Sequence, residues 1–145
     1  MKEDLKESGR GLSYTHMIIY GVVIELILVA IQFLYVRISG EVDDTSKFTN
    51  EYMRNTGFLI FQVIGFFVYV FATYFLTKRI QQNLISKLIL FLLAGAIVEL
   101  AFYLFMQADY AGAFLYSILD KFVAGFFGWI IYKFADRGHR VGKDY

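Results

Sequence analysis

Four ionisable side chains lie inside long apolar stretches of this sequence, where a charge is costly. They are Glu25, Glu99, Asp120 and Lys121. A charged side chain at the centre of a membrane helix costs about 2.5–3.5 kcal/mol on insertion scales. Three acids face one base, so at least one acid must be protonated, hydrated or bound to a cation. Ionisable groups in such positions commonly mark an ion or proton pathway.

The single base cannot be neutralised by its neighbour in the sequence. Asp120 and Lys121 are adjacent, and adjacent residues of a helix point about 100° apart. Lys121 therefore needs Glu25, Glu99 or an acid from another subunit. We expect Glu99 to be the exchanging acid because it lies closest in depth to Asp120. Glu25 is our second choice.

Other polar and small residues surround these charges in the sequence. Gln32, Gln62 and Ser117 are predicted to line the same region. Small residues let membrane helices approach closely. The candidate packing residues are Gly21, Gly95, Ala124, Gly125 and Gly128.

The buried charges are open to three interpretations. In the first, they only hold helices together, through a Lys–Glu pair and neutral acids that hydrogen-bond across helices. In the second, the surplus acids line a hydrated path or an ion site. In the third, a partner protein supplies the missing positive charge.

The elements that must position these residues are long apolar segments. The chain has 145 residues, of which 58% are hydrophobic, and its mean hydropathy is +0.54. The apolar segments cover about residues 17–36, 57–76, 88–106 and 111–134. Each has the roughly 20 residues that a helix needs to cross a bilayer, and a helix satisfies its own backbone hydrogen bonds there. The sequence predicts an all-α integral membrane protein, a single domain over 1–145 with a four-transmembrane-helix bundle.

Lysine and arginine set the expected orientation. Most of them lie in the tail 1–15, the segment after residue 76, and the tail 135–145. The segment 38–56 is rich in acids instead. The positive-inside rule places both tails in the cytoplasm and 38–56 outside, across the cell membrane. Within this outer loop, Ser46 could cap a short interfacial helix, and an ordinary acidic loop is an equal alternative.

Matching motifs in the two halves of the chain predict a duplicated helical hairpin. Gly21 and Glu25 are spaced like Gly95 and Glu99, and both glutamates precede a leucine. Gly-Phe-Phe begins at Gly65 and recurs in the last apolar segment. The two hairpins would be related by a pseudo-two-fold axis along the membrane normal.

Absent features exclude several function classes. The chain has no cysteine, and we find no Ser/His/Asp set, metal-ligand cluster or phosphate loop. We therefore expect no enzyme activity, cofactor or metal, and a net charge of +1 gives no reason to expect a nucleic-acid partner. The leading hypothesis is a channel or small transporter that uses the buried acids. Four helices enclose no wide pore, so it would be a homo-oligomer in the lipid bilayer. The alternative is a non-catalytic membrane-anchoring subunit or effector that docks a cytoplasmic partner on its basic inner face.

Overall fold

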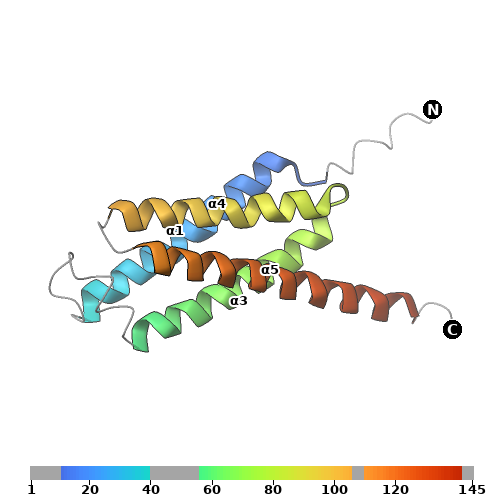
Figure 1. The fold of residues 1–145 in the computed structure, drawn as a ribbon. Helices are drawn as coiled ribbons and strands as arrows, with labels where there is room; N and C mark the ends of the chain where they lie inside the picture. The colour runs from blue at the N-terminus through green and yellow to red at the C-terminus, as the bar shows by residue number, and fades with distance from the viewer. Residues whose placement is uncertain (1–10, 40–55, 106–109, 142–145) are drawn as a thin grey trace.

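The chain forms four long helices in a computed structural model that describes residues 11–39, 56–105 and 110–141. The helices are α1 (Tyr14–Ser39), α3 (Thr56–Arg79), α4 (Leu84–Phe105) and α5 (Tyr110–Val141), and no strand occurs in these ranges (Figure 1). Each helix contains a segment long and apolar enough to cross a membrane. The prediction of four membrane-length helices and no sheet is thus confirmed.

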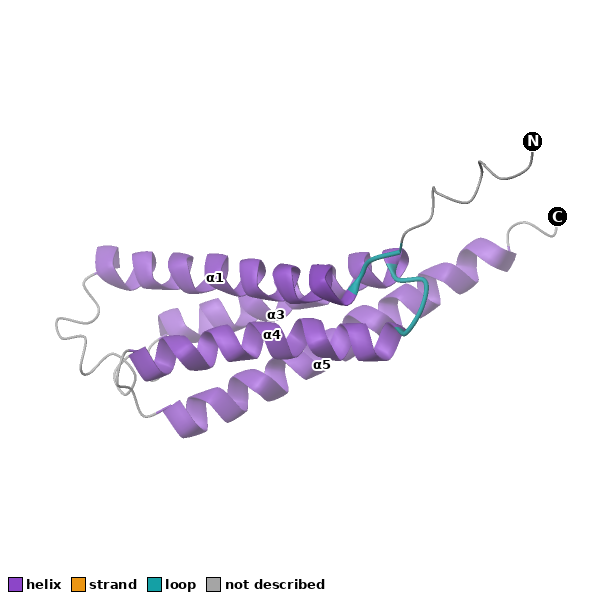
Figure 2. Cartoon of the chain, turned by 90° about the horizontal axis from the view of Figure 1, so that it is seen from above, coloured by secondary structure: helices purple, strands orange, loops and turns teal. Residues whose placement is uncertain are grey.

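Helices that follow each other in the chain are not always the ones that pack together. The main contacts join α1 to α4, α3 to α5, and α4 to α5. The chain reverses direction between helices, so α1 runs parallel to α4 and α3 runs parallel to α5 (Figures 1 and 2). The start of α1 and the end of α5 lie at the same end of the bundle, which we call the terminal end.

All four helices extend beyond the apolar segments predicted from the sequence, and α4 and α5 extend farthest at a single end. Helix α4 begins at Leu84 rather than near residue 88, and α5 continues to Val141 through the start of the segment predicted as a polar tail. Hydropathy detects only the part of a helix that lipid covers, whereas lysine, arginine and alanine are good helix formers in water as well. The predicted short helix after Ser46 lies outside the described residues.

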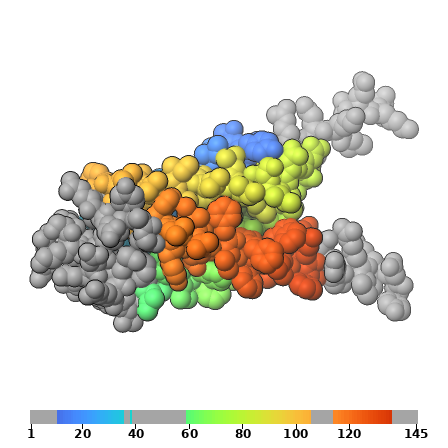
Figure 3. Space-filling view, in the orientation of Figure 1, coloured from blue at the N-terminus to red at the C-terminus, as the bar shows by residue number. Residues whose placement is uncertain are grey.

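Most of the apolar surface of the helices points away from the bundle. Only 17–44% of each candidate span is buried inside the protein, and large side chains such as Phe71, Leu119 and Phe126 are exposed. Apolar surface on this scale needs a cover other than water. Figure 3 shows the face on which α4 and α5 lie side by side. The chain is an integral membrane protein whose helices contact lipid.

The apolar core of the bundle extends to the terminal end. Met17, Tyr69 and Phe91 are almost fully buried in one cluster with Ile80 and Leu88. Met17 and Leu88 stand near the starts of their helices and Ile80 directly after the end of α3, so the cluster closes this half of the bundle.

Two threonines on α3 allow a direct test of this packing. Both are buried, but the Thr77 hydroxyl donates to the Thr73 carbonyl oxygen at 2.7 Å, whereas the Thr73 hydroxyl has no partner in the described part of the chain. A buried hydroxyl without a partner costs about 1–3 kcal/mol. We expect Thr73→Val to raise the unfolding free energy of the detergent-solubilised protein by about 1 kcal/mol. Thr77→Val, the matched control, should leave it unchanged or lower it.

Candidate functional site

The centre of the bundle holds a lysine between two glutamates. The Lys121 ammonium lies 3.4 Å from Glu25 Oε1 and forms a closer ion pair with Glu99 Oε2. It also donates to Ser117 Oγ at 2.7 Å. Both glutamates belong to the same chain as Lys121, and each stands at the matching position of its Gly-x-x-x-Glu motif. No second subunit is needed to pair this lysine.

Hydroxyl groups complete the environment of the two glutamates. The Tyr69 hydroxyl donates to Glu25 Oε2 at 2.6 Å, and the Tyr103 hydroxyl donates to Glu99 Oε1 at 3.1 Å. Ser117 donates to Glu99 Oε2. Buried carboxylates are tolerated when an ion pair and additional hydrogen bonds satisfy them together, and each glutamate has both.

The two tyrosines are site residues that the sequence interpretation missed. Tyr103 follows Glu99 by one helical turn, so the spacing alone places both on one face. Tyr69 belongs to α3 and donates to Glu25 on α1. The periodicity of a single helix does not show which residues of two different helices meet. The depth of Tyr69 was still a signal, because tyrosine in membrane helices is enriched at the interfaces rather than mid-span.

Asp120 differs from both glutamates. It is half-buried, and its carboxylate accepts no hydrogen bond and forms no ion pair from any described residue. The Lys121 charge is nearby but is directed to Glu25 and Glu99. Of the three predicted acids, Asp120 is therefore the one whose oxygens the described residues leave open to a ligand.

The charged cluster lines a small cavity on the side where α1 and α3 make few contacts. All seven ionisable and polar residues predicted to form the site line it, together with Leu28, Phe61, Gly65 and Tyr69. The predicted seven are Glu25, Gln32, Gln62, Glu99, Ser117, Asp120 and Lys121. The space open to water centres is about 40 Å³. One water needs about 10–15 Å³ by this measure, so the cavity has room for a few waters or a small ion.

The predicted packing residues lie at helix contacts inside the chain. A Cβ atom at Gly21 would stand 2.9 Å from Ala94 Cβ on α4, and one at Gly125 would stand 2.7 Å from a Leu92 methyl group. Gly128 lies against the backbone of α3, and Ala124 is fully buried. These contacts explain the small residues through the fold of one chain, without an oligomer interface.

Gly95 has a second role beside the buried glutamates. A Cβ atom there would overlap the Tyr69 hydroxyl and approach Glu25 Oε2 to 3.5 Å. The glycine therefore leaves the space in which Tyr69 donates to Glu25. This position links the packing of α4 to the polar cluster.

A metal centre of ordinary composition is not formed by the described residues. They contain no group of three or more His, Cys, Asp or Glu side chains placed to hold a metal ion. What the cluster offers is two tied carboxylates, one open carboxylate and several neutral oxygens around a small volume. This arrangement can take up a proton or a small cation.

Comparison with known proteins adds no identification. No protein-family model, curated protein or solved structure matches the chain. Function must therefore be inferred from the geometry of the site.

Proposed function

We propose that this chain is a small channel or transporter whose buried acids bind a proton or a small monovalent cation within the membrane. The observation that carries the proposal is the open carboxylate of Asp120, which faces a cavity beside an otherwise satisfied ion cluster. A purely structural cluster would need Lys121 and its partners but not a third acid. The surplus acid supports an exchanging role.

The size of the cavity restricts the proposed cargo. Sites for drug-sized organic ligands commonly measure about 300–1,000 Å³, whereas this cavity offers about 40 Å³. Protons, water and small ions remain as candidates. Ionisable residues inside membranes serve the same kinds of ligand in pumps and channels.

The three acids have different proposed roles. Glu25 and Glu99 fix Lys121 and are themselves held by hydroxyl donors. These contacts favour Asp120 rather than Glu99 as the exchanging acid. Gln32 and Gln62 line the cavity farther from the terminal end, where the closed apolar cluster stands. Access from the end opposite the termini fits this arrangement.

Ion flux into liposomes tests the proposal. Purified protein should carry protons, reported by a trapped pH-sensitive dye under an imposed potential, or ²²Na⁺, at least about tenfold faster than empty liposomes. Asp120→Asn should abolish the flux because it removes the open charge at nearly constant volume. Glu41→Gln, which removes an acid outside the predicted spans, is the matched control and should retain it. Absence of flux under every pH and potential, or full flux in Asp120→Asn, would contradict the proposal.

The proposed orientation places the terminal end in the cytoplasm. Its support is the excess of lysine and arginine near the chain ends and in the α3–α4 connection. Cysteines introduced at Asp44 and at Gln82 should then react with a membrane-impermeant maleimide from opposite sides of the membrane. Labelling of both from one side would contradict the four-span topology.

The proposed duplication is supported by the contact between matched motifs. Gly21 lies against Gly95, and both matching glutamates reach the same lysine. The site itself is asymmetric, because Lys121 aligns with Phe61 when Gly125 is matched to Gly65. We infer that two similar hairpins diverged where the polar cluster formed.

A second candidate function rests on the length of α5. This helix has 32 residues and continues from Ala135 to Val141, past its candidate membrane span. The continuation carries Arg137 and Arg140, and it favours the alternative of a membrane anchor for a cytoplasmic partner. The mass of the detergent-solubilised particle separates the two candidates. A homo-oligomer supports the channel, and a monomer that co-purifies with another protein supports the anchor.

A further inference from the structure

A second polar crevice lies at the terminal end of the bundle, apart from the central cavity. Gly11, Gln81, Gln82 and Lys87 line it, and its volume is about 170 Å³. The two glutamines belong to the short connection between α3 and α4, and Lys87 belongs to the first turn of α4. A Cβ atom added at Gly11 would lie 3.3–3.4 Å from Gln81, so the segment before α1 and this connection form one wall.

Lys87 is the unusual member of the crevice. The residue is only 8% exposed, yet none of the described side chains forms an ion pair or hydrogen bond with its ammonium group. The Tyr14 ring lies 5.4 Å away and offers a cation–π contact. Lys121, the other lysine that is buried among the described residues, is paired with two glutamates. The Lys87 ammonium group reaches the crevice and has no counter-ion among the described residues, so its charge favours an anion there.

We propose that the crevice binds a phosphate group through Lys87 and the side-chain amides of Gln81 and Gln82. Ammonium and carboxamide groups donate hydrogen bonds, and a phosphate presents several strong acceptors together with negative charge. The volume far exceeds the roughly 10–15 Å³ that one water needs by the same measure, so it accommodates a larger anion.

Two sources can supply this group. The crevice lies between the end of the α3 candidate span and the start of the α4 candidate span, and such span ends meet lipid headgroups. In the proposed orientation it faces the cytoplasmic leaflet, where anionic lipids are enriched. A phospholipid headgroup is one source, and a free phosphate in the aqueous phase is the other. The site is separate from the proposed ion pathway and does not depend on it.

Thermal unfolding of the full chain in neutral detergent tests this site. The probes are a short-chain phosphatidylglycerol, inorganic phosphate, and the matching phosphatidylcholine, whose phosphate is neutralised by its own choline cation. We expect phosphatidylglycerol, inorganic phosphate or both to stabilise the protein more than phosphatidylcholine does. If phosphatidylglycerol and inorganic phosphate both stabilise the protein, the crevice recognises the phosphate group that they share. If only the lipid does so, the natural ligand is a lipid headgroup. If only inorganic phosphate does so, the ligand is a free anion.

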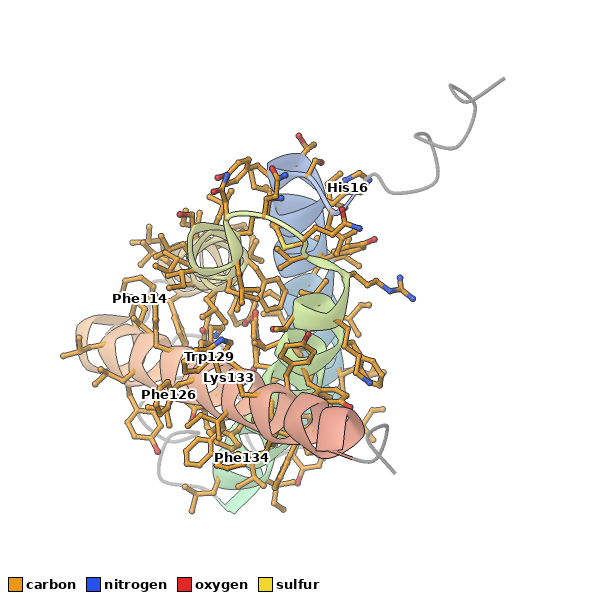
Figure 4. The ribbon with its side chains drawn as sticks, turned by 90° about the vertical axis from the view of Figure 1, so that its right-hand side faces the viewer. His16, Phe114, Phe126, Trp129, Lys133 and Phe134 are labelled. Carbon is orange, nitrogen blue, oxygen red and sulfur yellow. The ribbon has the colours of Figure 1, made fainter. Side chains whose placement is uncertain are left out.

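Matched lysine variants separate this site from general attraction to a basic surface. Lys87→Met should weaken the apparent affinity at least about tenfold while it keeps the apolar stem. Lys133→Met removes the same charge from an exposed lysine that lies beside Trp129 (Figure 4), and it should retain the wild-type affinity. Equal losses in the two variants would overturn the proposal, as would wild-type stabilisation by phosphatidylcholine equal to that by both phosphate probes.

A second crevice variant covers the case in which Lys87→Met does not fold. Gln82 is exposed on the crevice wall, so Gln82→Leu should fold normally. It should weaken phosphate binding several-fold because one donor is lost. Unchanged affinity in this variant would overturn the proposed part of the amide groups.

Discussion

Lys121→Met is expected to destabilise the bundle by about 3–5 kcal/mol, the range measured when one partner of a buried ion pair is removed. Lys121 is 6% exposed and is the cation that holds Glu25 and Glu99 together. Methionine keeps the length of the side chain, so the variant removes charge with little change in packing. The two carboxylates would then face each other with hydroxyl donors alone.

A double-mutant cycle identifies the partner that matters most. Glu99 forms the closer contact with Lys121 and shares Ser117 with it. We therefore expect Lys121→Met with Glu99→Gln to be more stable than Lys121→Met alone. The corresponding rescue by Glu25→Gln should be smaller. Coupling between residues in one ion network is commonly 0.5–3 kcal/mol.

Reversible unfolding in mixed detergent micelles measures these differences. Lys133→Met is the control, because that lysine is exposed and should contribute no more than about 1 kcal/mol, the value of an exposed cation–π contact such as its contact with Trp129. Additive losses for all acid and lysine changes would show that no pair exists. Equal stability of Lys121→Met and the parent would contradict the buried position of the charge.

The four spans were predictable because the thickness of the bilayer requires about 20 consecutive apolar residues in each helix that crosses it. The buried charges were also recognisable from the sequence, because each is an ionisable residue within an otherwise apolar segment. Gln32 and Gln62 are predicted to line the same region, and the structure places both at the same cavity. Depth in a membrane is readable from sequence because all spans share one reference plane.

The pairing of helices was not predictable from composition. In a soluble bundle the buried face is apolar and the outer face is polar, but here lipid and core both accept apolar side chains. Phe71 and Phe91 are the same residue type, and one is exposed while the other is fully buried. The contact of α1 with α4 therefore required the structure, and with it the bond from Tyr69 to Glu25.

This difference changes which acid is expected to exchange. Depth alone favoured Glu99, because it is level with Asp120. The structure places three donors on Glu99, from Tyr103, Ser117 and Lys121, and a carboxylate with occupied oxygens is poorly available to a ligand. The depth of an acid in the membrane indicates which other side chains it can meet. The hydrogen bonds and ion pairs in the structure decide which carboxylate remains open to a ligand.

Substitution of a glycine on α5, at its contact with α3, should give the second large effect. A Cβ atom at Gly128 would overlap the Val70 carbonyl oxygen and lie 2.9 Å from Thr73 Cβ. A backbone carbonyl cannot rotate away as a side chain can, so the two helices must separate. We expect Gly128→Ala to cost about 1–3 kcal/mol and Gly128→Leu to prevent assembly of the bundle.

Gly65 provides the matched control on the partner helix. It also lies inside a membrane span, but an added Cβ atom there meets nothing within 4 Å. Alanine is favoured over glycine in a helix by up to about 1 kcal/mol, so Gly65→Ala should leave stability unchanged or raise it. Unfolding in mixed micelles should separate the two alanine variants clearly. Equal stabilities of Gly128→Ala and Gly65→Ala would contradict the close contact between α3 and α5 at Gly128. A loss in Gly65→Ala would instead indicate that a second molecule covers this glycine, because no described part of the chain itself does.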